Sequence, residues 1–176
     1  QFNLNGVALK DRKGGNLSFT KAVKAVETDP ATLEVTGIRV VKYPPDYNNG
    51  DNVDNDFVIF RLADVLLMKA EAILRGGTAT NVAPYGATAL SIVNYVRTHS
   101  SRGASLLPSI NLDQLLDERG RELYWEGWRR MDLIRFGKFL QAGQIRKTTS
   151  PEARLLFPVP AQQIAANPNL TQNPGY

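Results

Sequence analysis

The spacing of hydrophobic residues changes near residue 57, and this change divides the chain into parts with different predicted structure. Before it, a polar stretch rich in Gly, Asn and Asp holds short apolar runs, of which 7–9 and 36–43 are the best strand candidates. After it, apolar side chains recur about every 3.6 residues, the period of an α-helix. We predict a strand- and loop-rich lead-in over 1–56 and a helical hairpin core over 57–140.

Four helices are expected in this core. The first begins at Phe57 and stops before the glycines at 76 and 77. Its polar positions fall on one narrow stripe, so a helix that is apolar around most of its girth should lie between neighbouring helices. The other three are expected from a Thr88 cap to about Arg97, from a capping box at Asn111 and Gln114 to about Trp125, and over 129–139.

The last segment, 141–176, is interrupted by prolines at its far end, which leave room for helical turns only over 161–166. Its hydrophobic residues predict an extended strap that lies over the helices rather than a free end. The fold class is therefore predicted as mainly α, with tetratricopeptide-like helical hairpins, a small β element near the N-terminus and an extended Pro-rich C-terminal tail.

The amino-acid composition excludes several kinds of catalytic and metal-binding site. The 176 residues carry a net charge of +4, with 43% hydrophobic and 22% charged residues, which is typical of a globular domain. No cysteine and a single histidine, His99, leave little scope for thiolate or imidazole metal sites. No Ser-His-Asp arrangement, glycine-rich phosphate loop or membrane-spanning apolar run is found. We predict no cofactor, no metal and no catalytic residue.

Two patterns of charged residues suggest possible functions, glycoside hydrolysis and nucleic-acid binding. Glu118 and Glu122 are four residues apart on one helical face, and a carboxylate pair is what glycoside hydrolysis needs. Interleaved arginines favour structural ion pairs instead, so hydrolysis stays the enzymatic alternative. The arginines with Trp125 and Trp128 could also suit nucleic acid, but acidic residues alternate with them, and no nucleic-acid partner is predicted.

The polar loop over 46–56 offers oxygen ligands, but it fails the calcium-loop pattern because its glycine is fifth and Phe57 replaces the final acid. Turn formation explains the same residues. Tyr43, Tyr47 and Asn48 combine aromatic faces with polar atoms, which also suits a sugar. They are the candidate carbohydrate-binding residues.

Three motifs occur in order along the chain. They are NDFVIFRLADVLLMKAEA from Asn55, LDERGRELYWEGWRRMDLIRFG from Leu116, and LFPVP from Leu156 with NPNLTQNPGY to the end. Together they resemble the C-terminal region of the SusD/RagB family of outer-membrane nutrient-binding lipoproteins, over about 37–176.

The resemblance implies non-catalytic capture of oligosaccharides, or of peptides in some members, at the bacterial cell surface. It implies delivery to a SusC-like, TonB-dependent outer-membrane transporter, and a lipid anchor in a part that this chain lacks. A helical protein-interaction scaffold without its own ligand site is the alternative. The family's recurrent charged positions are expected to form interhelical ion pairs here, at Arg61, Asp64, Glu118, Arg119, Glu122, Glu126, Arg129, Arg130, Asp132 and Arg135.

Overall fold

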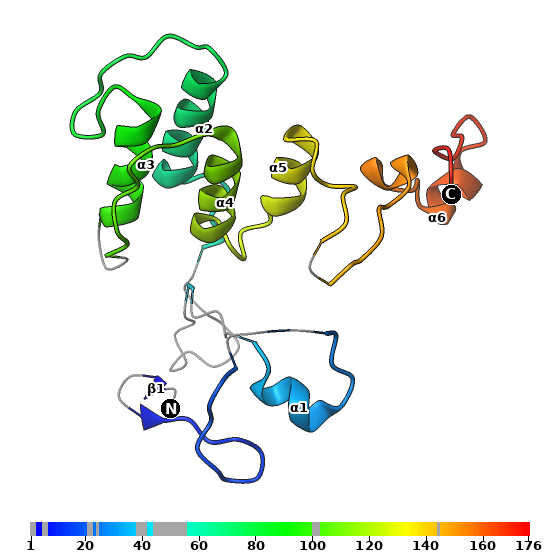
Figure 1. The fold of residues 1–176 in the computed structure, drawn as a ribbon. Coiled ribbons are helices and arrows are strands. Elements are labelled where there is room, and N and C mark those ends of the chain that lie inside the picture. Colours follow the sequence, from blue (N-terminus) through cyan, green and yellow to red (C-terminus); the bar gives the residue numbers. More distant parts are fainter. Residues whose placement is uncertain are drawn as a thin grey trace. The chain divides into compact units, whose positions relative to one another are not determined.

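The computed structural model describes residues 3–4, 7–20, 23, 25–37, 42–43, 56–99, 103–143 and 145–176. The chain forms two units, one over Pro45–Phe139 and the other from Gln1–Pro44 and Leu140–Tyr176. The first unit holds four α-helices in its described part, α2 to α5 (Figure 1). The mainly α fold class is confirmed.

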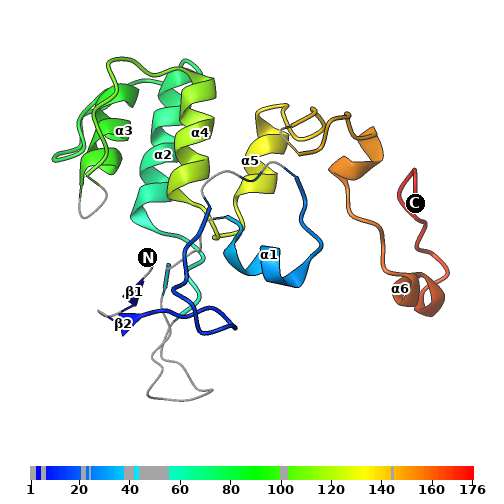
Figure 2. The same ribbon diagram turned by 60° about the horizontal axis from the view of Figure 1, so that its bottom comes forward.

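Helix α2 (Leu62–Leu74) lies between α3 and α4 and contacts both (Figures 1 and 2). The predicted position between neighbours is therefore confirmed for these two sides. The helix begins five residues after the predicted Phe57, because Arg61 is extended, with φ −141° and ψ 161°. It ends as predicted, before Gly76, whose φ of +98° favours glycine.

Helices α3 (Ala89–Thr98) and α4 (Leu112–Glu122) begin where the predicted Thr88 cap and the predicted Asn111–Gln114 capping box place them, and the structure shows a capping box at both. The Thr88 hydroxyl accepts from the Ser91 backbone at 3.1 Å, and the Asn111 side chain accepts from the Gln114 backbone at 2.9 Å. Each box satisfies backbone N–H groups that the first helical turn leaves unpaired.

Two helix ends were predicted too late. Helix α4 stops at Glu122 rather than near Trp125, which adopts a left-handed backbone with φ +68°. Helix α5 (Arg129–Arg135) stops short of residue 139, because Gly137 turns the chain with φ +68° and its N–H bonds to the Ile134 carbonyl. The left-handed residue follows the C-cap directly in α5, whereas in α4 it comes two residues after the C-cap Leu123.

The core is built mainly by α2 and α3. Leu67, Ile92 and Val93 are completely buried, and Leu115 adds a contribution from α4. Asn94 of α3 holds the next loop in place, because its side chain accepts from the Leu107 N–H at 2.8 Å and donates to the Leu107 carbonyl at 3.0 Å. The end of α3 is thereby held close to the chain that leads into α4.

The lead-in contains two short paired strands, β1 (Asn3–Leu4) and β2 (Val7–Ala8), in antiparallel register. The predicted strand over 7–9 is confirmed at β2, whereas the middle of 36–43, residues 38–41, lies outside the described residues. The sequence analysis missed α1 (Pro30–Val35), although Asp29 caps it and Pro30 occupies its first turn.

The tail contains a 3-10 turn, η3 (Glu152–Leu155), and α6 (Ala161–Ala166), which matches the predicted turns over 161–166. The end of the chain returns toward η3. The Gln172 side chain bonds both ways with the Val159 backbone, at 2.8 and 2.9 Å, and the Tyr176 hydroxyl donates to the Leu156 carbonyl at 2.9 Å. That the tail lies over the helices remains a prediction.

Candidate functional site

A buried arginine joins three helices. The Arg119 guanidinium of α4 donates to Asp64 of α2 and to Asp132 of α5, each at 2.9 Å. These three residues are at most 1% exposed. Charge-assisted hydrogen bonds are about twice as strong as neutral ones. Good hydrogen-bond geometry is needed here, because it must offset the cost of removing the charges from water. The expected interhelical pairing is confirmed for this triad.

A second cluster of charged residues, around Arg135 and Glu71, adjoins this triad. Arg135 of α5 donates two hydrogen bonds to Glu71 of α2, both at 2.9 Å, and a third to Asp132 at 2.7 Å. Burial alone would raise the pKa of Glu71, but hydrogen bonds from Arg135 and Arg75 outweigh burial and hold the pKa below its ordinary value. Glu71 therefore stays charged between α2 and α5.

Glu118, one of the two possible catalytic acids, lies in a similar environment. It accepts from Arg97 of α3 at 2.5 Å and from Arg121 at 3.0 and 3.1 Å. Burial would raise the pKa of its carboxyl, but the hydrogen bonds and charges of Arg121 and Arg97 hold it below the ordinary value. A general acid needs the opposite shift.

The second possible acid, Glu122, pairs with Arg61 at 2.7 Å. Arg61 also binds the Glu126 carboxylate at 2.8 Å and donates to the Glu122 carbonyl at 2.6 Å. One side chain ahead of α2 therefore bonds to both the side chain and the backbone at the end of α4.

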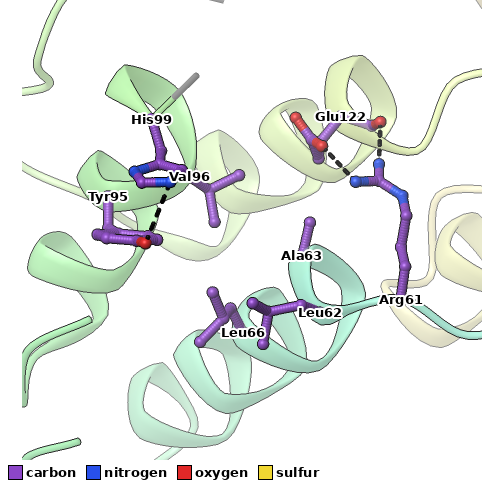
Figure 3. Close-up of a pocket in the computed structure, with 8 residues that line it drawn as sticks. All are labelled: Arg61, Leu62, Ala63, Leu66, Tyr95, Val96, His99 and Glu122. Carbon is purple, nitrogen blue, oxygen red and sulfur yellow. Dashed lines mark hydrogen bonds and ion pairs between the residues drawn. The ribbon is translucent and has the colours of Figure 1, made fainter. Parts of the chain in front are cut away.

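The Arg61–Glu122 pair forms one wall of a pocket of about 290 Å³, shown in Figure 3. The opposite wall belongs to α3, where the Tyr95 and His99 rings stack with centroids 4.6 Å apart and an interplanar angle of 19°. The floor is aliphatic and comes from α2 and α3, namely Leu62, Ala63, Leu66 and Val96.

This pocket has the chemistry of a binding site for a small uncharged or polar molecule. The Glu122 carboxylate is paired with Arg61, which also binds Glu126, and the Tyr95 hydroxyl lies 3.4 Å from Nε2 of His99. An apolar floor with a few polar groups at the rim is typical of ligand pockets, and 290 Å³ is close to their lower size limit. The sequence analysis missed Tyr95, although its spacing of four from His99 on a helix could have indicated the pair.

The predicted carbohydrate-binding residues are described only in part. Tyr43 has a left-handed backbone, with φ +55°, and its side chain is 41% exposed. Tyr47 and Asn48 lie outside the described residues, as does most of the loop over 46–56. The three residues stay predicted contacts.

Two of the arginines expected in ion pairs also contact uncharged groups. Arg129 donates to the Leu116 carbonyl of α4 at 2.8 Å. The Arg130 guanidinium lies over the Phe139 ring, 5.0 Å from its centroid. The sequence analysis also overlooked Glu71, Arg75 and Arg97 as members of the network. Glu71 and Arg97 bind the distant Arg135 and Glu118, whereas Arg75 binds Glu71 at a spacing of four that the sequence could have indicated.

Within the described ranges, no helix is long and apolar enough to cross a membrane. In the same part of the chain, no three His, Asp or Glu side chains are placed to hold a metal ion.

Residues 13–176 match the model of the SusD family. Starch-binding protein SusD of Bacteroides thetaiotaomicron is 31% identical over 168 residues, which are 87% of this chain and 28% of that protein. SusD-like protein P38 of Formosa agariphila is 29% identical over 178 residues, covering 93% of this chain and 32% of that protein. The chain thus spans about a third or less of these relatives' length.

Solved structures of glycan-binding and SusD superfamily proteins are also similar to this chain. Surface glycan-binding protein A from Bacteroides thetaiotaomicron, in complex with laminarihexaose, aligns with a TM-score of 0.53 and 30% identity, over 69% of this chain and 26% of that one. A SusD superfamily protein from Parabacteroides distasonis aligns with a TM-score of 0.56 and 28% identity, over 71% and 28%. The match of the family model over most of the chain, together with these relatives, shows that the chain belongs to the SusD family.

Proposed function

We propose that this chain is part of a protein that captures oligosaccharides at the bacterial cell surface without cleaving them. The observation that carries the proposal is the similarity to a surface glycan-binding protein solved with laminarihexaose, at 30% identity. The match to a starch-binding protein at 31% identity points the same way. Both relatives are named for glycan binding, so a glycan is the ligand class that we propose.

The environment of the two glutamates supports binding rather than hydrolysis. Arg97 and Arg121 hold Glu118 in its charged form, and Arg61 occupies the Glu122 carboxylate. A retaining or inverting glycosidase needs one carboxyl that carries a proton near neutral pH. The ion pairs oppose that state.

Two places on the chain are suited to contact sugar. The first is the predicted set Tyr43, Tyr47 and Asn48, and the exposure of Tyr43 supports its part in it. The second is the pocket beside His99, whose stacked rings and apolar floor could receive one end of a glycan chain. Variants at the two places separate their contributions.

Delivery to a SusC-like, TonB-dependent outer-membrane transporter and a lipid-anchored location at the outer membrane complete the proposal. Both rest on the family resemblance, and the anchor would belong to polypeptide outside these 176 residues. Copurification with an outer-membrane transporter from detergent-solubilised membranes would test the partnership.

Native electrophoresis in gels that contain laminarin or starch tests glycan capture, and calorimetry with laminarihexaose measures affinity. We expect retarded migration of the wild-type chain. Y43A or H99A should weaken binding about tenfold where that aromatic residue contacts sugar. Y124A removes another exposed tyrosine and serves as the control.

Unchanged migration in every polysaccharide gel would refute glycan capture by this chain. Release of reducing sugar ends that E122Q abolishes would establish hydrolysis in its place.

A further inference from the structure

The aromatic wall of the pocket belongs to a row of three rings. The Tyr85 ring meets the Tyr95 ring at an interplanar angle of 86°, with centroids 4.9 Å apart. Tyr95 in turn stacks on His99. Tyr95 and His99 line the pocket, whereas Tyr85 is not among the described residues that surround it. Any influence of Tyr85 on a bound molecule must therefore pass through Tyr95.

Helix α3 places Tyr95 and His99 side by side but leaves the planes of their rings undecided. The two residues are four apart, which puts them on one face of the helix, and His99 is the C-cap whose N–H bonds to the Tyr95 carbonyl at 2.9 Å. The torsion that turns an aromatic ring about its Cβ–Cγ bond has broad minima. A contact from outside the helix therefore sets the orientation, and the Tyr85 ring makes such a contact.

The connection between α2 and α3 holds Tyr85 in place. The N–H groups of Tyr85 and Gly86 both bond to the Val82 carbonyl, at 2.8 and 3.2 Å, so the chain forms a tight turn. Gly86 has φ +89° and lies against Ser91 in the first turn of α3, where a Cβ would collide with the Ser91 hydroxyl oxygen. Tyr85 itself is partly buried and packs against the core. The turn is thus anchored to the helix whose far end carries the pocket.

We propose that Tyr85 is a positioning residue of this pocket. Its ring selects the plane of the Tyr95 ring, and so directs the Tyr95 hydroxyl and the His99 imidazole stacked beside it. Hydrogen bonds weaken steeply when donor and acceptor are misaligned, so a small rotation of Tyr95 changes what the pocket can bind. The assignment rests on the proposed capture of glycans, because it takes a sugar residue as the bound molecule.

The two polar groups that Tyr85 directs are suited to a sugar. The Tyr95 hydroxyl and Nε2 of His99 lie 3.4 Å apart, opposite the ion pair that forms the other wall (Figure 3). A hydroxyl can donate and accept, and a neutral imidazole offers one donor and one acceptor. Adjacent hydroxyl groups of one sugar ring can bond to both. The aliphatic floor suits the C–H groups of that ring, and a volume of about 290 Å³, near the lower limit of ligand pockets, favours a single sugar residue.

Variants of Tyr85 test the assignment, and His99 supplies the readout because it is the only histidine of the chain. Its imidazole C–H resonances in NMR spectra are therefore assigned without ambiguity, and their shifts report the neighbouring Tyr95 ring. Y85F keeps the aromatic ring, whereas Y85L and Y85A remove it with and without an apolar replacement. I73A is the matched control, because Ile73 also packs against the core but is not among the described residues of the pocket. Calorimetry with laminarihexaose, or with maltohexaose where starch retards the chain, measures affinity.

The proposal predicts a different result for each variant. Y85F should keep the wild-type resonances and affinity. Y85L and Y85A should shift the His99 resonances and weaken binding about three- to tenfold, the effect of losing one aromatic pair. I73A should lower the melting temperature and change neither readout.

Three results would overturn the assignment. Unchanged His99 resonances in Y85L and Y85A would show that Tyr85 does not order the two rings. Shifted resonances without a loss of affinity would separate that order from binding. An equal loss of affinity in I73A would ascribe the effect to general destabilisation. A wild-type chain that binds no oligosaccharide refutes glycan capture itself, and the resonances of Y85L then still decide whether Tyr85 orders the rings.

Discussion

Replacing Arg119 with methionine should strongly destabilise the helical unit. Arg119 joins Asp64 to Asp132 with two hydrogen bonds of 2.9 Å, and R119M removes both while Asp64 stays completely buried. Breaking a buried ion pair by removing one partner costs about 3–5 kcal/mol, because a charge is left without compensation. For a chain of this size, that cost lowers the melting temperature by roughly 6–20 °C.

Urea denaturation followed by circular dichroism measures the change in the free energy of unfolding. K138M is the control, because it removes a cation from the exposed pair with Asp113, whose atoms lie 3.3 Å apart. An exposed pair contributes about 0–1 kcal/mol. D64L/R119M removes Asp64 together with the arginine, while Asp132 keeps its hydrogen bond from Arg135 at 2.7 Å. The double variant should therefore recover much of the stability, since apolar side chains of similar volume often replace such pairs without loss.

A cost of R119M no larger than that of K138M would refute this reasoning. A double variant as unstable as R119M would show that the cost arises from lost packing or from the lost Asp132 bond, and not from the stranded Asp64 charge.

The remaining predictions concern acid stability, a loop and the tail. The lowered pKa values of Glu71 and Glu118 stabilise the fold above their ordinary value of 4.5, and this contribution should be lost as pH falls below it. Urea midpoints between pH 7 and pH 3 measure the loss, and E118Q should flatten it; an equally steep decline in E118Q would contradict the assignment. N94A should cost about 1–3 kcal/mol, because the Leu107 backbone loses both partners, and hydrogen exchange over 103–110 should accelerate. Q172A should speed proteolysis of the tail by releasing the Val159 backbone, whereas Q162A, at an exposed position on α6, should not.

The fold was predictable where local signals decide it. A Thr88 cap and an Asn111–Gln114 capping box located the starts of α3 and α4, and prolines restricted the helical turns of the tail to 161–166. The late estimates for the ends of α4 and α5 have a common cause. The helical spacing of apolar residues in the sequence continues past positions where the backbone is left-handed. At Trp125 the residue is not a glycine, so the sequence gives no sign of the left-handed conformation.

The pairing partners of the charged residues were only partly predictable. Interleaved signs indicated ion pairs for Arg130, but they did not indicate that its guanidinium also lies over the Phe139 ring. Replacing Arg130 with alanine is expected to unfold the domain or to lower its melting temperature, and an unchanged melting curve would remove this structural role.

The sequence by itself determined the helical class, the capped helix starts and the excess of paired charges, because each depends on residues within one or two turns. Only the tertiary structure decided which charges meet. Arg61 pairs with Glu126 across 65 positions, and Arg119 with Asp64 across 55. The same packing directs the acids of α2 inward and leaves its aliphatic side chains outside. Local periodicity cannot assign those sides, because the neighbours that distinguish them come from distant parts of the chain.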